Sequence, residues 1–395
     1  MKGSITWVPF GEVVKKSQYG ISAKAAQGAS IPMLRMGNIQ DGRLDLSDLV
    51  YVELSDSERE QLLLKKGDFL FNRTNSKDLV GKSALVEHDL EATFASYLVR
   101  FKLDLDKVDP RFILACFNST SGLARVRGLA SPGVSQYNIN PTVLQEAFEI
   151  PILPIKEQVK IGDILSTWDR AIKHVNLLLR AYQLHKSNVS VRVFSRLTCE
   201  TYRLEDVCEK IMVGIASAAT HAYRPSGIPM LRNQNIKEGR IDTNDLLYID
   251  ESYEKTHQNK RLKEGDVLTV RTGYPGVSAV VPKSLHSAQC FTSLISRPKQ
   301  GVLHSGYLAH LINSHVGRRF ILGAEAGGAQ KNVNAATLAE LPIPLPKLEV
   351  QAAISLLLDT LQNNIQVLQN LASDIALQKQ GLMQKLLTGK VRVKV

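Results

Sequence analysis

The chain has 395 residues, 44% of them hydrophobic, and its 49 Lys and Arg outnumber its 38 Asp and Glu to give a formal net charge of +11. No segment has the ~20 consecutive apolar residues of a membrane span, and the first residues lack the apolar core of a secretory signal, so we expect a cytoplasmic protein without a membrane helix. The basic excess favours a polyanionic partner but does not require one.

The first globular region covers residues 1–152 and mixes short strands with a helix. The runs Asp68–Phe71 and Tyr97–Leu103 have the pattern of strands, and Pro110–Phe117 has the pattern of a helix. A proline-rich exit, Pro151–Pro154, ends the region. These features predict a mixed α+β domain of about 150 residues.

Residues 153–197 are predicted to form a long spacer helix. Proline is absent and glycine occurs only at Gly162 between residues 157 and 195, while apolar residues recur at spacings of three and four. A helix of roughly 35–40 residues spans about 55 Å. Because an isolated amphipathic helix of this length needs a partner, we expect a second one like it.

The remainder of the chain repeats this plan. Ile31–Arg35 recurs as Ile228–Arg232, 197 residues later, and nine of the thirteen positions from 31 to 43 are identical at that offset. We predict a second globular domain at 198–343, with a strand at Val267–Val270 and a helix at Gly306–Ile312, followed by a C-terminal spacer helix and tail at 344–395. A repeat near half the chain length is typical of a duplicated domain.

The two helical segments are predicted to pack as a pair of antiparallel coiled-coil helices that separate the domains. Their apolar positions share one heptad phase, with His185 and Gln378 at the same polar slot. The predicted helix–helix seam consists of Ile161, Ile164, Trp168, Val175, Leu178 and Tyr182 with Ile354, Leu357, Leu361, Leu368, Leu371 and Ile375. The predicted fold class is therefore α+β, with two duplicated domains separated by two long helices.

Catalytic and metal-binding motifs are missing from the sequence. It has no GxGxxG or GxxxxGK[ST] phosphate-binding loop and no histidines at metal-ligand spacing, and Asn140-Pro141 lacks the aromatic of an NPPY-type methyltransferase motif. The four cysteines are scattered without a CxxC pair, which favours reduced core thiols. We expect a chain that is not itself an enzyme and holds no metal or cofactor.

Binding chemistry is better represented, in two loops that each begin with arginine. Arg73-Thr74 and Arg271-Thr272 end strand-like runs and open polar loops that contain Lys77 and Lys82 in one copy and Tyr274 in the other. Arginine here suits a phosphate contact or a bidentate guanine contact. The alternative is an internal ion pair, for example between the arginine and Asp68.

Two further sets of repeated polar residues are candidates for DNA contact. The first is an amide cluster, and amides read adenine edges but are also common turn and capping residues. It comprises Gln136, Tyr137, Asn138 and Asn140 in one copy and Gln330, Lys331, Asn332 and Asn334 in the other, with Tyr137 and Lys331 as a copy-specific pair. The second set lies in the best-matched block, where a structural role is the alternative. It comprises Arg35, Asn38, Arg43, Arg232, Asn235 and Arg240.

The order of these motifs, found twice, resembles the DNA-specificity (S) subunit of type I restriction-modification systems. The resemblance covers nearly the whole chain and rests on the Ile-Pro-Met-Leu-Arg block, the Gly-Asp-x-Leu-x-x-Arg loop, the proline-rich exit with Gln158 or Gln351, and the long helix that follows. The chain departs from the family pattern at Val350, where an acid is expected, and this leaves the start of the second helix in doubt.

The resemblance implies a non-catalytic subunit whose two target-recognition domains read a bipartite, asymmetric site in double-stranded DNA. It implies that the helices set the spacing and dock two modification (methyltransferase) subunits, which bind S-adenosylmethionine and methylate adenine, and that restriction/translocase subunits use ATP and Mg²⁺ for cleavage. The alternatives are a stand-alone DNA methyltransferase or nuclease with a diverged site, and a coiled-coil adaptor that does not bind DNA.

Overall fold

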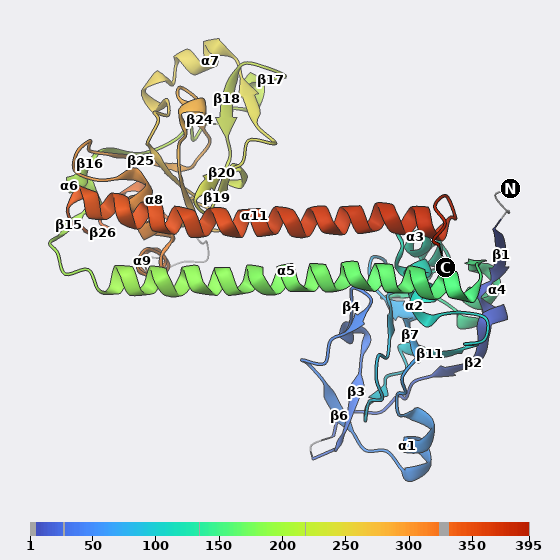
Figure 1. The fold of residues 1–395 in the computed structure, drawn as a ribbon. Coiled ribbons are helices and arrows are strands. Elements are labelled where there is room, and N and C mark those ends of the chain that lie inside the picture. Colours follow the sequence, from blue (N-terminus) through green and yellow to red (C-terminus); the bar gives the residue numbers. More distant parts are fainter. Residues whose placement is uncertain (1–4, 27, 134, 218, 324–331, 395) are drawn as a thin grey trace. The chain divides into compact units, whose positions relative to one another are not determined.

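The computed structural model describes residues 5–26, 28–133, 135–217, 219–323 and 332–394. It contains two compact units, of which unit 1 is Met1–Val175 with Leu371–Val395 and unit 2 is Asn176–Asn370. The long helices α5 (Ile155–Ser195) and α11 (Leu348–Leu387) each contribute to both units, as Figure 1 shows. Each unit therefore combines a globule with parts of two helices, in contrast to a linear division of the chain at residues 152, 197 and 343.

Unit 1 consists of short strands and helices in addition to its parts of α5 and α11. Its strands are β1 (Thr6–Pro9), β2 (Val14–Tyr19), β3 (Ile31–Leu34), β4 (Ile39–Gln40), β5 (Arg43–Leu44), β6 (Val50–Val52), β7 (Phe69–Asn72), β8 (Thr74–Asn75), β9 (Ser83–Leu85), β10 (Thr93–Phe94), β11 (Leu98–Leu103), β12 (Ser131–Pro132), β13 (Tyr137–Asn138) and β14 (Glu149–Ile152). Its helices are α1 (Asp56–Leu62), α2 (Pro110–Asn118), α3 (Thr120–Gly128) and α4 (Pro141–Ala147), with 3-10 turns η1 (Phe10–Val13) and η2 (Met36–Asn38).

Unit 2 has a closely similar order of elements. Its strands are β15 (Thr201–Arg203), β16 (Cys208–Val213), β17 (Tyr223–Arg224), β18 (Ile228–Leu231), β19 (Ile236–Lys237), β20 (Arg240–Ile241), β21 (Leu247–Ile249), β22 (Val267–Thr269), β23 (Ser278–Val280), β24 (Gln289–Cys290), β25 (Leu294–Pro298) and β26 (Pro342–Pro344). Its helices are α6 (Leu204–Val207), α7 (Glu251–Lys255), α8 (Ser305–Asn313), α9 (His315–Gly323) and α10 (Ala335–Ala339), with 3-10 turns η3 (Thr220–Ala222), η4 (Asn233–Asn235), η5 (Gln258–Lys260) and η6 (Lys283–Leu285).

The sheets confirm that the two units are copies of one fold. The four-stranded sheet β2-β11-β7-β9 of unit 1 has the same order as β16-β25-β22-β23 of unit 2. A second sheet pairs β3 with β10 in parallel and β6 antiparallel, and β18 does the same with β24 and β21. In each copy the strand that carries Ile-Pro-Met-Leu therefore has a neighbour on both sides, and its Met and Leu are buried.

Close backbone contact explains one repeated glycine. A Cβ added to Gly20 would lie 2.2 Å from the carbonyl oxygen of Phe94, and one added to Gly214 would lie 2.3 Å from that of Cys290. Both glycines follow the first strand of the four-stranded sheet, where the chain passes the edge of the second sheet. Only a residue without a Cβ permits this approach.

The core of unit 1 is rich in phenylalanine, whereas that of unit 2 is mainly aliphatic. Phe10 packs edge-on against Phe101 and Phe117, with ring centroids 5.2 and 4.9 Å apart. Three of the four cysteines are buried, and burial raises the pKa of Cys208 and of Cys290 to about 12. These thiols therefore stay protonated, as expected for core residues.

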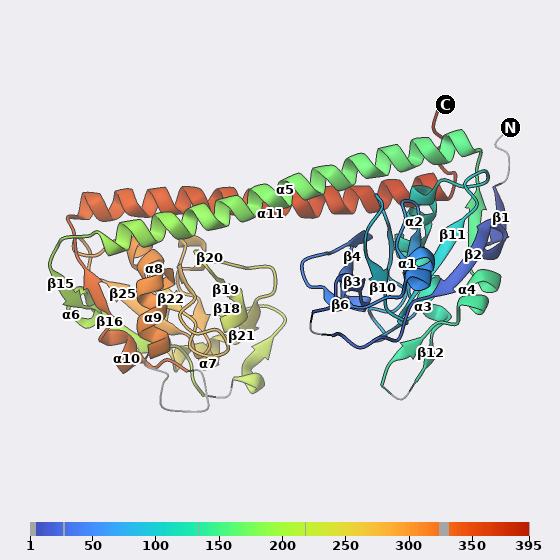
Figure 2. The same cartoon turned by 90° about the horizontal axis from the view of Figure 1, so that it is seen from below.

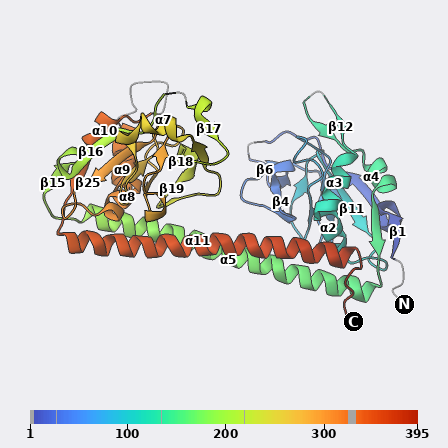
Figure 3. The same cartoon turned by 90° about the horizontal axis from the view of Figure 1, so that it is seen from above.

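In both units the segments of α5 and α11 lie side by side, as Figures 2 and 3 show. In unit 1 their contacts are antiparallel, since Asp169 binds Lys379 at 2.7 Å while Glu157, earlier in α5, binds Arg392 beyond the end of α11. Helix α11 ends at Leu387 and is followed by Gly389 with φ of +63°, a common helix-terminating conformation.

The predicted seam is only partly correct. Ile161, Val175, Ile354 and Leu361 are buried, and Ile164, Trp168, Tyr182, Leu368 and Ile375 are partly buried, but Leu178, Leu357 and Leu371 are exposed. Two residues outside the predicted seam, Leu165 and Leu358, are buried in the core clusters of the globules. The buried stripe is shifted from the heptad prediction because each helix packs against a globule as well as against the other helix.

The two polar residues that the heptad pattern places in the helix–helix seam do not lie there. His185 and Gln378 are both exposed. The neighbouring residue Lys186 is buried instead of His185, and its Nζ donates to Gln362 on α11 at 2.5 Å. Its counterpart in the repeat is Lys379, which binds Asp169.

The start of the second helix does not depend on the acid that Val350 replaces. Gln351 donates to the carbonyl of Pro346 at 2.8 Å and accepts from the amide of His304 at 2.8 Å. Gln158 makes the same contacts in unit 1, with Leu153 and Asp109. Glutamine thus anchors both helices to their globules, and Glu157 is used instead for the ion pair with the C-terminal tail.

Candidate DNA interface

The asparagine of the best-matched block holds the fold together in both copies. Asn38 accepts from the amide of Arg35 at 2.7 Å and donates to the carbonyls of Asp45 and Asp48 at 2.8 Å. Asn235 repeats all three bonds, with the amide of Arg232 and the carbonyls of Asp242 and Asp245.

Both side chains are buried and their amides are fully engaged, so we correct the expectation that they contact DNA. Their role is to shape the turn that follows the central strand of the second sheet, which is why the block is so well matched between the copies.

The arginines of that block are tethered at the surface. Arg35 pairs with Asp48 at 3.0 Å and Arg232 with Asp245 at 2.7 Å. Both carboxylates are largely exposed, so these ion pairs are weak and exchange readily for a phosphate. Arg35 and Arg232 therefore remain candidates for DNA contact.

The structure places Arg43 and Arg240 elsewhere. Each follows a tight turn through Gly42 or Gly239, which have φ of +80° and +73°. A Cβ on Gly42 would lie 3.0 Å from the side chain of Asn118 on α2, and one on Gly239 would lie 3.3 Å from Gln362 on α11. These turns therefore pack against helices, and the hairpin of Arg43 reaches the end of the unit 1 loop, where Gln40 accepts from Lys82.

Arg73 does not form the internal ion pair with Asp68, because Asp68 pairs with Arg100 instead. Asp68 is buried and pairs at 3.1 Å with Arg100, which is 2% exposed. In the described part of the chain no carboxylate pairs with Arg73, whose guanidinium lies 5.2 Å from the ring centre of Tyr19. Unit 2 has the same arrangement, with Asp266 paired to Arg297 and Arg271 outside the pair.

The loop of unit 1 is held by a small sheet. β8 pairs with β13, and β13 pairs with β12, so that Thr74 lies opposite Asn138. The buried hydroxyl of Thr74 donates to Oδ1 of Asn138 at 2.5 Å. Tyr137 is half-buried opposite Asn75, and Arg73 lies one residue before β8. The structure thus brings Arg73 and Thr74 next to Asn138 and Tyr137 of the amide cluster.

The other candidates of this unit are spread around the loop. Lys77 is exposed beyond β8, whereas Lys82 contacts Gln40 of β4 at 3.2 Å. Gln136 is half-buried in the turn before β13. Asn140 caps α4 by accepting from the amide of Thr142, so its side chain serves the helix.

In unit 2 the loop is held by the η4 turn. Asn233 donates to the hydroxyl of Thr272 at 3.0 Å, and the hydroxyl of Tyr274 donates to the carbonyl of Asn233 at 2.9 Å. Arg271 donates from Nε to Asn332 at 3.0 Å. Thr272 and Tyr274 are both exposed. Asn334 caps α10 as Asn140 caps α4, while Gln330 and Lys331 lie outside the described residues.

Several residues of these surfaces were not found from the sequence. Tyr19 and Tyr97 are exposed beside Arg73, whose backbone amide donates to the carbonyl of Tyr97 at 3.0 Å. Asn233 and Gln234 occupy the places of Met36 and Gly37. Asn233 and Gln234 could have been found from the sequence, because they are mismatches between the copies inside a well-matched block.

Four buried polar atoms in or beside these loops and turns have no hydrogen-bond partner within the described part of the chain. The Nε atoms of Arg35, Arg73 and Arg232 and Oδ1 of Asn72 are buried without a hydrogen-bond partner in the described residues. Asn72 is fully buried and donates to the carbonyl of Met36 at 3.4 Å, which places it beside η2. Buried atoms without such a partner also occur at Thr93, Arg100, Arg127, Gln289 and Ser296, so these four do not by themselves indicate a ligand site.

Comparison with known proteins identifies the fold. The family model for the type I restriction modification DNA specificity domain matches the chain twice, at residues 8–179 and 197–376. The chain belongs to this family. It is a DNA sequence-specificity subunit of a type I restriction-modification system, with one specificity domain in each repeat.

Two relatives and one solved structure illustrate the similarity. The putative type I restriction enzyme MjaX specificity subunit of Methanocaldococcus jannaschii is 24% identical and covers 97% of this chain and 92% of that protein. The type I restriction enzyme EcoKI specificity subunit of Escherichia coli is 23% identical and covers 82% and 74%. The S subunit of a type I system from M. genitalium has the same fold, with a TM-score of 0.64, 13% identity and coverage of 97% and 96%.

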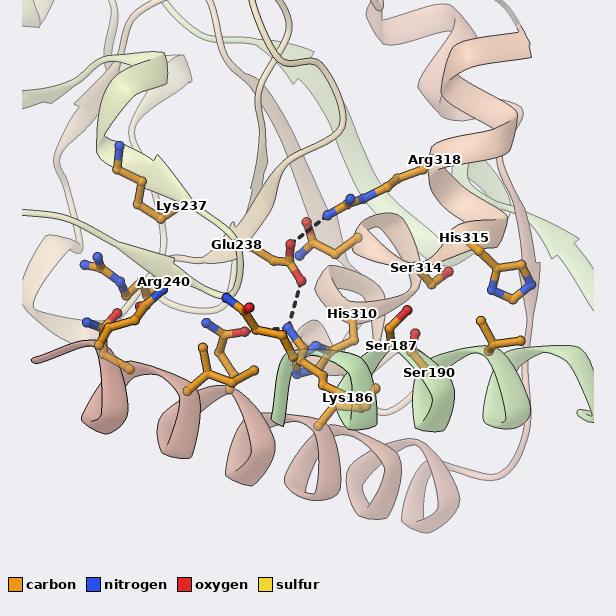
Figure 4. A pocket seen from close by; sticks show the side chains of 18 residues that line it. Lys186, Ser187, Ser190, Lys237, Glu238, Arg240, His310, Ser314, His315 and Arg318 are labelled. Atoms are coloured by element: carbon orange, nitrogen blue, oxygen red, sulfur yellow. Dashed lines mark hydrogen bonds and ion pairs between the residues drawn. The ribbon is translucent and has the colours of Figure 1, made fainter. Parts of the chain in front are cut away.

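Unit 2 of this specificity subunit has a basic cavity of about 570 Å³ between the globule and the helices α5 and α11 (Figure 4). Glu238 at the turn between β19 and β20 accepts from Lys186 of α5 at 2.7 Å and from Arg318 of α9 at 2.6 Å. Burial opposes ionisation of Glu238, but the two cations lower its pKa below the usual value. Arg240 lines this cavity too.

The described residues contain no group of three or more His, Cys, Asp or Glu placed to hold a metal ion. Within the same residues, no helix has the length and apolar content to cross a membrane.

Proposed function

We propose that each unit reads one half of a bipartite, asymmetric target in double-stranded DNA, through the loop led by Arg73 in unit 1 and by Arg271 in unit 2. The observation that carries this proposal is the pairing of a common frame with different loops. Asn38 and Asn235 make the same three bonds, and Asp68 and Asp266 each pair with an equivalent arginine, yet the exposed residues beside them differ. Two readers of this kind recognise two different sequences.

The exposed groups in unit 1 suit contact with DNA. Arg73 has no carboxylate partner among the described residues, and its guanidinium lies over the exposed ring of Tyr19. Lys77 and Arg35 add positive charge around the same loop, and the amide of Asn138 is tied to Thr74 nearby. Arginine and amides are the groups that read guanine and adenine in the major groove, and basic side chains bind phosphates.

A set of variants tests this proposal in the complex with the modification subunits. We expect Arg73→Ala to change the preference at one half-site and Arg271→Ala to change it at the other, measured by selection from a library of duplexes with randomised bases. Arg203→Ala serves as the control because Arg203 is an exposed arginine outside both loops. A library from which the wild-type complex selects no sequence would refute DNA recognition and favour an adaptor.

We further propose that exposed leucines on the helices dock two modification subunits. Leu184 on α5 and Leu377 on α11 hold equivalent places in the repeat and are 64% and 70% exposed. On α5, Leu177 and Val191 lie one heptad on either side of Leu184 and are also exposed. Apolar side chains at heptad spacing fit a helix of a partner protein, and the equivalent exposed leucine on α11, whose heptad neighbours are Asn370 and Gln384, offers a second docking position.

Under this proposal the chain is non-catalytic and cytoplasmic. The modification subunits bind S-adenosylmethionine and methylate adenine, and restriction/translocase subunits bind ATP and Mg²⁺. We expect Leu184→Gln and Leu377→Gln each to remove one modification subunit from the purified complex and the double variant to remove both, as measured by native mass spectrometry. Leu105→Gln is the control, since Leu105 is 58% exposed but lies off both helices. Methyl transfer by the isolated chain would instead support a stand-alone enzyme.

A further inference from the structure

The two units fasten their arginine-led loops in different ways. In unit 2 Asn233 connects three segments. Its side chain donates from Nδ2 to Thr272 at 3.0 Å and accepts at Oδ1 from Ser293 at 2.8 Å. Its backbone carbonyl accepts from the hydroxyl of Tyr274 at 2.9 Å. Ser293 is buried and therefore fixes the orientation of the amide. The exposed loop is thus attached to the turn that Asn235 shapes.

Unit 1 has Met36 at this place and fastens its loop elsewhere. A methionine side chain cannot donate a hydrogen bond, and Thr74 instead donates to Asn138 of the neighbouring strand at 2.5 Å. Thr74 is buried, whereas its counterpart Thr272 is exposed. The hydroxyl that unit 1 uses for its fold is therefore available in unit 2 for another contact.

The bonds to Asn233 hold two exposed hydroxyls in place. The hydroxyl of Thr272 accepts from Nδ2, so its proton stays available outward, together with its second lone pair. Tyr274 donates its proton to the backbone carbonyl of Asn233, so its oxygen offers only lone pairs. The loop therefore presents two hydroxyls at fixed positions, and the side chain of Asn233 holds the first of them.

We propose that Asn233 is a positioning residue that sets the base preference of unit 2 by holding the hydroxyl of Thr272 in place, with its proton available, toward base edges in the major groove. This inference rests on the proposed function of the same surface and adds to it the residue on which discrimination by one half depends. A base edge is distinguished by its order of donors and acceptors, so a reader whose polar groups are held in place discriminates better than one whose groups move.

Three variants test the proposal in the complex with the modification subunits, with the randomised duplex library as the probe. Asn233→Met introduces the residue of unit 1 and should reduce discrimination about tenfold at one position of the half-site read by unit 2. Asn233→Asp keeps the acceptor for Ser293 but draws the proton of Thr272 inward, so a preference for an acceptor at that position of the half-site should be lost. The half-site read by unit 1 should be unchanged in both. Asn363→Asp, on the exposed surface of α11, is the control for the added charge.

Thr272→Val removes the exposed hydroxyl without altering the amide of Asn233, and it should relax the same position. A profile identical to wild type in Thr272→Val and Asn233→Met, or an equal change in both half-sites, would overturn the proposal. These results are distinct from failure of the proposed function, in which the wild-type complex itself selects no sequence. If Asn233→Met does not fold, the other two variants still show whether discrimination by unit 2 depends on the Thr272 hydroxyl and on its bond to Asn233.

Discussion

Removing the buried carboxylate of Asp68 should destabilise unit 1 far more than the same substitution at the surface. Asp68 lies at the start of β7 and pairs at 3.1 Å with Arg100 of β11, and the two side chains are 5% and 2% exposed. Asp68→Asn keeps the shape of the side chain but leaves the guanidinium without a counter-charge. The loss of one partner from a buried ion pair typically costs about 3–5 kcal/mol.

The remaining contacts of Arg100 place the expected value at the lower end of this range. Its guanidinium also donates to the carbonyl of Leu63 at 3.0 Å, to the carbonyl of Gln61 at 2.5 Å and to the side chain of Gln18. These acceptors keep its hydrogen bonds but do not neutralise its charge, so we expect about 3 kcal/mol. For a unit of 200 residues this corresponds to a decrease of ~6–12 °C in the melting temperature.

Calorimetry of the two variants Asp68→Asn and Asp48→Asn measures the effect. Asp48 pairs with Arg35 in the same unit, but its side chain is 88% exposed, so its loss should cost less than ~1 kcal/mol. Hydrogen exchange of the β7 and β11 amides should locate the destabilisation in unit 1. Equal shifts for both variants, or a decrease below ~3 °C for Asp68→Asn, would refute the argument from burial.

Three further predictions concern the frame. Gly214→Ala should destabilise unit 2 by ~1–3 kcal/mol in denaturant titration, because its Cβ would clash with the carbonyl of Cys290, and no change would contradict the close approach. The ion pairs of Glu238 lower its pKa below 4.5. Their contribution to the stability of the fold is therefore present above that pH and is lost as the pH falls through the folded pKa. The difference in free energy of unfolding between wild type and Glu238→Gln should narrow in acid and not in base. In the native chain at pH 8 a thiol reagent should modify Cys199 but not Cys208 or Cys290, whose pKa values of about 12 keep them protonated, and rapid reaction of either would show that the core is open.

The larger elements of the fold could be predicted because their patterns are local. The helix expected at Pro110–Phe117 is α2, Pro110–Asn118, and the strand expected at Tyr97–Leu103 is β11, Leu98–Leu103. The comparison of the copies also predicts that the units share one fold, since identical residues at a constant offset occupy equivalent places. Periodicity and repetition are properties of the sequence alone.

The seam and the roles of the polar residues could not be predicted in the same way. Heptad spacing indicates that α5 and α11 have an apolar face, but it does not show that the face is shared between a helix and a globule, which is why Leu165 is buried and Leu178 exposed. Nor does the sequence distinguish Asn38, which binds three backbone groups, from a residue that binds a base. That distinction depends on contacts between segments far apart in the chain.

The comparison of the two copies separates frame from reader once the contacts are known. Residues that make the same internal bonds in both units, such as Asn38 with Asn235 and Gln158 with Gln351, are explained by the fold. Asn233 is different, because it makes internal bonds that its counterpart Met36 cannot make, and those bonds orient exposed groups. Identity between copies therefore marks what holds each unit together, and the residues that set the difference between the half-sites should be found where one copy has replaced a frame contact with another.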